Sequence, residues 1–306
     1  MISIIICSRE SYIPRELQQN IAETIGNDYE LVVIDNSLNQ YSIFQAYNLG
    51  VQQAKGDILC FCHNDIKFLT PEWGKIVHDY FSLFPKLGCL GVAGSHVMFN
   101  CPSSFWQTSF LSIYVQYIYP DGRLQLCEER EPSDENRRET QVVTVDGLWM
   151  CIRKELFKTV KFDEINFHGF HCYDSDICMQ IINSNYEIIV TYQILIQHKA
   201  NVELDISYYN AIETWHRKWT NHLPIIRGIT IAENDIKKYT SFVTSQISLD
   251  KQILQLKKEP KRMCKNMYSL FLKNTLRYLK NLFYKHWSYI EKNENCHPQK
   301  NRASNI

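Results

Sequence analysis

The 306-residue sequence contains no run of about 18 uncharged apolar residues, and it therefore predicts no transmembrane helix. The apolar N-terminus, Met1 to Ile6, is six residues long, has no basic segment before it and continues into Ser8-Arg9-Glu10. This pattern is typical of a strand and not of a signal peptide. We expect a cytoplasmic protein.

The cysteines do not form a pattern that suggests disulfides or a zinc site. They are eleven, an odd number, and they are scattered along the chain, which favours reduced thiols over a disulfide framework. Cys60-Phe61-Cys62 lacks the CxxC spacing of a zinc knuckle, and its apolar setting predicts two buried thiols.

Two common phosphate-binding motifs are also missing. No GxGxxG follows the first apolar run, which argues against a dinucleotide-binding Rossmann enzyme, and no GxxxxGK[ST] is present, which argues against a P-loop. If the protein binds phosphates, other groups must neutralise their charge.

The formal net charge of zero conceals an uneven distribution. From Lys251 to Ile306 there are 13 Lys and Arg against 3 Glu, so the first 250 residues carry a net charge of about −10. An acidic body argues against nucleic-acid binding. Charge alone leaves three surfaces open for the basic tail: an anionic membrane, a nucleic acid or an acidic partner.

Apolar residues make up 45% of the chain, enough for a sizeable core. Strand-like apolar runs alternate with helical periodicity, which predicts an α/β fold with a mostly parallel sheet flanked by helices. Residues 100–140 are irregular. The expected strands are 2–7, 30–34, 57–62, 88–93, 141–145 and 187–191, and the expected helices are 14–25, 43–54, 71–84, 154–159 and 174–183.

The alternation ends near residue 230, and helical periodicity continues over 234–256 and 263–290. We therefore predict an α/β domain over residues 1–230, a basic helical appendage over 231–292 and a disordered tail over 293–306.

Three of the predicted strands end in polar residues, namely Ser8-Arg9, Asp35-Asn36 and His63-Asn64-Asp65. Ligands of parallel sheets bind beyond the carboxyl ends of the strands, so these residues are candidates for one site. A carboxylate at Asp65 is suited to a divalent cation that bridges to a diphosphate. The alternative is a turn cap before Lys67, and these residues alone leave both interpretations open.

Asp174 and Asp176 lie two positions apart at the start of a predicted helix. Capping of the helix N-terminus explains such a pair without catalysis. A carboxylate directed towards a substrate can instead accept a proton from a hydroxyl group. His198 ends the short segment Ile196-Gln197-His198, to which the last predicted strand leads. Two interpretations stay open for it, a metal ligand and an ordinary hydrogen-bonded residue.

With these residues in order, the sequence resembles the family 2 glycosyltransferases of the GT-A fold, and most closely a bacterial branch whose metal motif begins with His. The resemblance covers about residues 1 to 220, and its specificity lies in the order and spacing of the motifs. They are ISIIICSR (2–9), LVVIDNS (31–37), YNLG (47–50) with AKGD (54–57), HND (63–65), DG (146–147), YDSDIC (173–178) and His198.

The resemblance implies an inverting enzyme that transfers a single sugar from a nucleotide-sugar donor to a glycan or glycoconjugate acceptor, with Mn²⁺ or Mg²⁺ as cofactor. It implies that Asp65 and His198 bind the metal and that Asp174 is the catalytic base. The residues implied to bind the nucleotide sugar are Ser8, Arg9, Asp35, Asn48 and His63.

The sequence departs from the family pattern at two positions. His63 replaces the first acid of the usual Asp-x-Asp, and Tyr173 replaces the Glu of the usual Glu-Asp pair. These departures motivate an alternative, a catalytically silent domain that binds a nucleotide or a glycan. A nucleotidyltransferase would need a glycine-rich basic loop after the first strand, and residues 8–15 contain no glycine. For the basic appendage we expect peripheral contact with the inner face of a membrane, or self-association.

Overall fold

The structure, a computed structural model, describes residues 1–108, 110–130, 136–199 and 205–258, excluding the side chains of residues 246, 249 and 252–258. The chain divides into two compact units, Met1–Lys251 and Gln252–Ile306. The predicted helix 263–290 and the predicted tail 293–306 lie outside the described residues, so the predicted division into domains stays a prediction.

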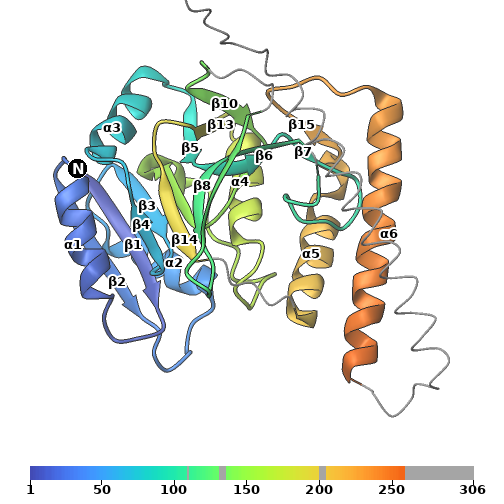
Figure 1. Ribbon diagram of the computed structural model, residues 1–306, viewed down its shortest axis with the longest axis horizontal. Coiled ribbons are helices and arrows are strands. Elements are labelled where there is room, and N and C mark those ends of the chain that lie inside the picture. Colours follow the sequence, from blue (N-terminus) through green and yellow to red (C-terminus); the bar gives the residue numbers. More distant parts are fainter. Residues whose placement is uncertain (109, 131–135, 200–204, 259–306) are drawn as a thin grey trace, which may run out of the picture. The chain divides into compact units, whose positions relative to one another are not determined.

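A seven-stranded sheet forms the centre of the first unit, in the order β10-β13-β5-β12-β3-β1-β2 (Figure 1). Strands β1, β2 and β3 are parallel, as the sequence predicts, whereas β12 runs antiparallel to both β3 and β5. The strands are rich in Ile, Val and Leu because both faces of the sheet are covered. Their bounds are β1 Ile2–Ser8, β2 Tyr29–Asp35, β3 Ile58–Cys62, β5 Leu87–Gly91, β10 Glu139–Val142, β12 Trp149–Arg153 and β13 Glu187–Thr191.

A second sheet has the order β11-β6-β8-β14-β4, with β9 paired to β8. The longest strands of this sheet, β8 and β9, lie within residues 100–140, where the sequence predicts no regular element. Strand β9 escapes prediction because it is largely exposed and has no alternating burial. The bounds are β4 Ile66–Phe68, β6 Ala93–Ser95, β8 Leu111–Ile118, β9 Leu124–Glu129, β11 Thr144–Val145 and β14 Ile196–Lys199; β7 Val97–Met98 and β15 Ile225–Ile226 form a separate pair.

Helices cover both faces of the main sheet, and an apolar core lies on each face. One core contains residues of α2, α4 and α5, including Trp215 and Trp219, and the other contains residues of α1, α3 and the second sheet. Thus the predicted α/β fold class is confirmed. The bounds are α1 Arg15–Thr24, α2 Ile43–Gln53, α3 Trp73–Leu83, α4 Tyr173–Asn183, α5 Ile206–Trp219 and α6 Glu233–Lys258, with short 3₁₀ helices η1 Lys154–Lys158 and η2 Thr220–His222.

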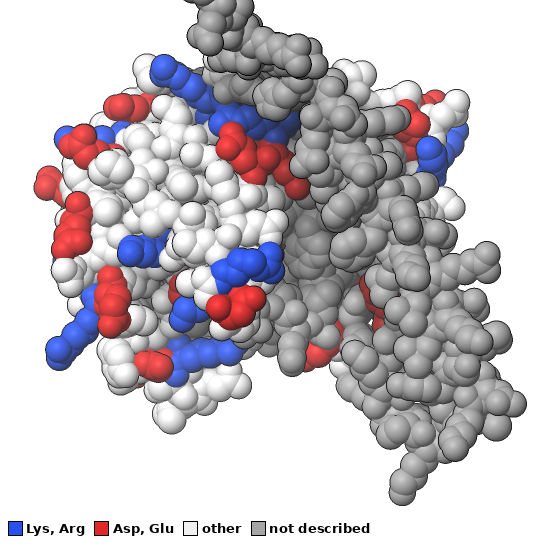
Figure 2. Space-filling model, viewed as in Figure 1, with Lys and Arg blue, Asp and Glu red and all other residues white. Residues whose placement is uncertain are grey.

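Within the described part of the chain, no helix combines the length and apolar composition needed to cross a bilayer. On the face drawn in Figure 2, acidic and basic side chains of the described residues are interspersed. All nine described cysteines are free thiols.

Candidate active site

The strand directions bring the predicted site residues to one edge of the main sheet. Because β1, β2 and β3 are parallel, Ser8, Asp35 and His63 lie at or just beyond their carboxyl ends. Strand β12 is antiparallel and begins at the same edge, where Trp149 pairs with Cys62. The turn that precedes β12 therefore joins the site.

This turn, Asp146-Gly147-Leu148, contacts two of the predicted functional segments. The carbonyl of Leu148 accepts the backbone N–H of His63 at 3.0 Å. The backbone N–H of Gly147 donates to Oδ2 of Asp174 at 3.0 Å. The end of β3 and the start of α4, more than 100 residues apart in sequence, are thus fixed to the same three-residue turn.

His63, Asp65 and His198 form the one group of potential metal ligands found among the described residues, with all their ligand atoms within 4.8 Å of one another. Strand β14 pairs antiparallel with β4, which places His198 opposite Ile66 and hence beside Asp65. Nε2 of His198 lies 3.5 Å from Oδ1 of Asp65, and Nδ1 of His63 lies 3.8 Å from the same oxygen. The two imidazole nitrogens are 3.4 Å apart.

The donor set of this cluster fits a divalent cation. Imidazole nitrogens and carboxylate oxygens are both common ligands of divalent metal ions in proteins. The side chains of His63 and Asp65 are 36% and 38% exposed, and that of His198 is 14% exposed, so one side of the cluster is open to further ligands. The sequence predicts Asp65 and His198 as ligands, and the structure adds His63.

The ionisable groups of the cluster shift one another's pKa values. Burial acts to raise the pKa of Asp65, but its hydrogen bond to His198 and the charges of both histidines hold that pKa below its usual value. Burial acts to lower the pKa of His198, but the carboxylates of Asp65 and Asp146 raise it. Burial and the neighbouring His198 lower the pKa of His63.

Asp174 lies at the start of α4, next to this cluster. The preceding residue, Tyr173, reaches the His63 ring with its hydroxyl, 2.8 Å from Nε2. Burial raises the pKa of Asp174 to about 6, and the negative charge of Asp146 adds to this effect, although the backbone N–H groups of Ser175 and Gly147 oppose it. A carboxyl with that pKa is largely ionised at neutral pH and can still accept a proton.

Asp176, in contrast, is 1% exposed and its carboxylate is occupied by structural partners. It accepts hydrogen bonds from Nζ of Lys218 and from the indole N–H of Trp219, both on α5. The residue that precedes α4, Cys172, provides no side-chain cap to the helix. Asp174 itself accepts the first-turn backbone N–H of Ser175 at 2.7 Å, so a capping role stays open for it, and its other partner is the turn at Gly147. Asp176 joins α4 to α5.

Two of the predicted nucleotide-binding residues are exposed at strand ends. Arg9 lies with its guanidinium 5.7 Å from the centre of the Phe170 ring, and the Asp35 carboxylate accepts the backbone N–H of Ser37 at 2.9 Å. Both groups keep donors or acceptors that a ligand can use.

Ser8 and Asn48, two more of the five predicted nucleotide-binding residues, have internal partners. The hydroxyl of Ser8 donates to the Tyr12 carbonyl at 2.7 Å and so closes the turn after β1. The side-chain amide of Asn48 pairs with the backbone N–H and carbonyl of Phe162 at 3.1 and 2.9 Å. Their contact with a nucleotide sugar stays a prediction.

Asp146, Gly147 and Lys218 also contact the site residues, and the sequence alone predicts no role for them. The first two stand in the quoted DG motif, directly before a strand, and this position is the available signal for a residue at the sheet edge. Lys218 gives no such signal, because only the packing of α5 against α4 shows its partners.

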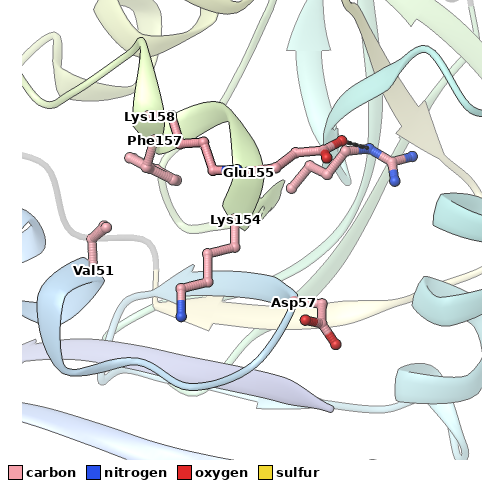
Figure 3. A pocket seen from close by; sticks show the side chains of 7 residues that line it. Val51, Asp57, Lys154, Glu155, Phe157 and Lys158 are labelled. Atoms are coloured by element: carbon pink, nitrogen blue, oxygen red, sulfur yellow. Dashed lines mark ion pairs between the residues drawn. The ribbon is translucent and has the colours of Figure 1, made fainter.

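A pocket lies at the opposite end of the sheet and is separate from this site (Figure 3). Asp57, one of its lining residues, directly precedes β3, whereas His63 directly follows it. Several charged groups that line this pocket have partners within the protein. Nζ of Lys154 donates to the Ala54 carbonyl at 2.7 Å, and Arg153 pairs with Glu155 at 3.8 Å.

Comparison with known proteins places the chain in a family. A family model described as "Glycosyltransferase like family" matches residues 3–218, and the chain belongs to that family. This match confirms the predicted glycosyltransferase family and supports glycosyl transfer as the class of activity. No curated protein matches the sequence.

Three solved structures are similar to this chain at low sequence identity. GalNAc-T7, in a crystal structure with UDP, GalNAc and Mn²⁺, is 12% identical over 66% of this chain, with a TM-score of 0.47, and this chain spans only 44% of its length. TarS 1-349 from S. aureus, in complex with UDP-GlcNAc, is 13% identical over 81% of this chain and 72% of its own, with a TM-score of 0.47. A197 from STIV is 11% identical over 76% of this chain and 96% of its own, with a TM-score of 0.39.

Proposed function

We propose that this chain is an inverting glycosyltransferase that moves one sugar from a nucleotide-sugar donor to a hydroxyl of a glycan or glycoconjugate. The observation that carries the proposal is the single turn that links the two halves of the site. It bonds to His63 through Leu148 and to Asp174 through Gly147. A basic carboxylate and a cluster suited to a cation consequently stand at one edge of the sheet.

In this proposal Asp65, His198 and His63 hold a divalent cation, Mn²⁺ or Mg²⁺. When bound, such a cation neutralises the charge that develops on the departing nucleoside diphosphate. The two imidazole ligands favour Mn²⁺ over Mg²⁺, because Mg²⁺ prefers oxygen ligands. The exposed side of the cluster is where diphosphate oxygens would complete the coordination.

Asp174 would act as the general base. It takes the proton of the acceptor hydroxyl while that oxygen forms a bond to the anomeric carbon of the sugar, and the bond from this carbon to the diphosphate oxygen breaks. Direct displacement of this kind inverts the anomeric centre. The backbone N–H groups of Gly147 and Ser175 hold the carboxylate at both oxygens, which fixes its orientation for the transfer.

The donor nucleoside would bind beyond β1 and β2. The exposed Arg9 guanidinium and Asp35 carboxylate are two of the charged groups there, and Ser8 shapes the loop that holds Arg9. Asn48 fixes the segment at Phe162 and would act on the donor through that segment.

The test is a panel of UDP-, GDP- and dTDP-sugars, each with Mn²⁺ or Mg²⁺, followed first by thermal shift and then by release of the nucleoside diphosphate. We expect one donor class to stabilise the protein and to be turned over. The double variant Asp65→Ala, Asp174→Ala should lose turnover, and undiminished turnover by it would exclude the proposal. Asp57→Asn, an exposed acid at the other end of the sheet, is the matched control.

The replacement of the usual first metal-site acid by His63 favours one alternative, a silent domain that binds a nucleotide or a glycan. Calorimetry separates the two. A silent domain binds a nucleotide without turnover of any donor and acceptor pair, whereas the enzyme couples both. For the basic segment after residue 250 we propose contact with an anionic membrane surface or with a second copy of the chain.

A further inference from the structure

Tyr173 occupies the position where the family pattern has a glutamate, and its surroundings hold it rigidly. It is the first residue of α4, and its ring is buried. The ring packs edge-on against Tyr47 at 5.5 Å and against Phe44 at 6.4 Å between centroids. A tyrosine enclosed in this way has little rotamer freedom, so its hydroxyl has a defined position.

That hydroxyl meets the one nitrogen of His63 that faces away from the metal cluster. Nε2 of His63 lies 2.8 Å from Oη of Tyr173, while Nδ1 faces His198 at 3.4 Å and Asp65 at 3.8 Å. A neutral imidazole that binds a cation through Nδ1 must carry its proton on Nε2. The Tyr173 oxygen is placed to accept that proton as a hydrogen bond.

Gly147 makes this contact sterically possible. A Cβ atom added at Gly147 would lie 2.1 Å from Oη of Tyr173, closer than any real contact. Any larger residue at position 147 would push the hydroxyl away from His63. The same glycine donates its N–H to Asp174, so the turn shapes both the metal ligand and the base.

We propose that Tyr173 is a positioning residue for the metal site: its hydroxyl holds His63 in the Nε2–H tautomer and thereby presents Nδ1 to the cation. The inference rests on the proposed function in that it assumes the cluster binds a metal. Because Tyr173 and Asp174 are consecutive, a cation on His63 also steadies the first turn of α4 and hence the base. Such outer hydrogen-bond partners commonly contribute tenfold to a hundredfold in metal affinity.

The first experiment measures metal affinity directly on the whole protein. Free Mn²⁺ is counted by electron paramagnetic resonance during titration of the wild type, Tyr173→Phe and Tyr80→Phe. Tyr80 is the matched control, since it is also a buried tyrosine whose hydroxyl is hydrogen-bonded, to Gln193 on the segment after β13. We expect Tyr173→Phe to weaken Mn²⁺ binding by about tenfold to a hundredfold and Tyr80→Phe to leave it unchanged.

The second experiment needs no metal. Nitrogen-15 chemical shifts of the histidine rings report the tautomer, and we expect the Nε2–H form of His63 in the wild type and a mixture in Tyr173→Phe. Gly147→Ala, whose methyl group displaces the hydroxyl, should give the same mixture. An unchanged tautomer in both variants would overturn the inference.

The two readouts separate this inference from the proposed function. If the wild type shows the Nε2–H form but binds no Mn²⁺, the metal-dependent function fails and the positioning role with it. If the wild type binds Mn²⁺ and Tyr173→Phe binds it equally, only the positioning role fails. If the inference holds, excess Mn²⁺ should restore donor turnover in Tyr173→Phe, a rescue that general structural damage would not permit.

Discussion

Asp174 and Asp176 lie two positions apart in the first turn of α4, yet their carboxylates bond to different parts of the protein. Asp174 accepts from the backbone of Gly147, at the sheet edge, and Asp176 from Lys218, on α5. The first has no cationic partner among its hydrogen bonds, and its pKa is raised to about 6. The second pairs with the Lys218 ammonium group, although burial raises its pKa as well. This division predicts that substitution of Asp174 affects mainly turnover and that substitution of Asp176 affects mainly stability.

Asp174→Asn should reduce kcat by about a hundredfold to ten-thousandfold, because a positioned general base contributes that much. The melting temperature should change less than the turnover, since the amide keeps the size of the carboxylate and its oxygen can still accept one of the two backbone N–H groups. Steady-state turnover of the best donor measures the first effect and a thermal melt the second. Asp57→Asn should match the wild type, and an active Asp174→Asn enzyme would remove the base from this position.

The activity should depend on pH through Asp174. Its carboxyl must be ionised to accept a proton, so kcat/KM should fall tenfold per pH unit below about 6 and level off above it. Because the folded pKa lies above the usual value, the free energy of unfolding should decrease as pH rises from about 4 to about 6.

The charge of Asp146 is part of the cause of that shift, so Asp146→Asn should move the acid limb to lower pH. The amide can still accept the Leu148 N–H through Oδ1, which preserves the turn. A pH profile of kcat/KM for both proteins provides the measurement. A midpoint unaffected by Asp146→Asn would show that another group sets the limb.

Asp176→Leu should destabilise the fold without removing a group that takes part in the reaction. Removing this buried carboxylate takes from Lys218 one of its two acidic partners. Because Asp163 still pairs with that lysine, we expect a cost of about 3 kcal/mol, the lower end of the usual range. Urea unfolding measures it. The added change Lys218→Met should recover part of the loss, and strict additivity of the two variants would contradict the pairing.

Mn²⁺ should raise the melting temperature of the wild type and not that of Asp65→Ala. A ligand at a hundred times its dissociation constant stabilises the folded state by about 2.7 kcal/mol, which a thermal shift resolves easily. His198→Ala should behave like Asp65→Ala because the two side chains are 3.5 Å apart. Treatment with EDTA should abolish turnover, and equal stabilisation of all three proteins would place the metal elsewhere.

The basic segment should bind anionic vesicles in a salt-sensitive way. The full chain is compared with a variant in which Lys257, Lys258, Lys261, Arg262 and Lys265 are all Gln, by flotation with phosphatidylserine vesicles. We expect only the first to float at low salt. If neither floats, sedimentation of both proteins tests self-association instead.

The sequence predicts most of the elements that surround the site. Period-two and period-3.6 patterns locate β1, β2, β3 and the helices between them within a few residues, because these elements bury continuous apolar runs. The second sheet is harder to predict, since β9 is largely exposed and has no such pattern. The antiparallel direction of β12 likewise cannot be predicted from the local sequence pattern, because it depends on which strands become its neighbours.

The same division holds for the site. Asp65, Asp174 and His198 are named by the sequence, since acids and histidines at the ends of apolar runs are visible in one dimension. Only the tertiary structure decides which of the two carboxylates lacks a cationic partner and which nitrogen of His63 faces Asp65 and His198. Those choices depend on Gly147, Tyr173 and Lys218, whose partners lie 27 to 110 positions away. Contacts over such separations are set by the packing of α4 against the sheet and α5, and no local pattern records them.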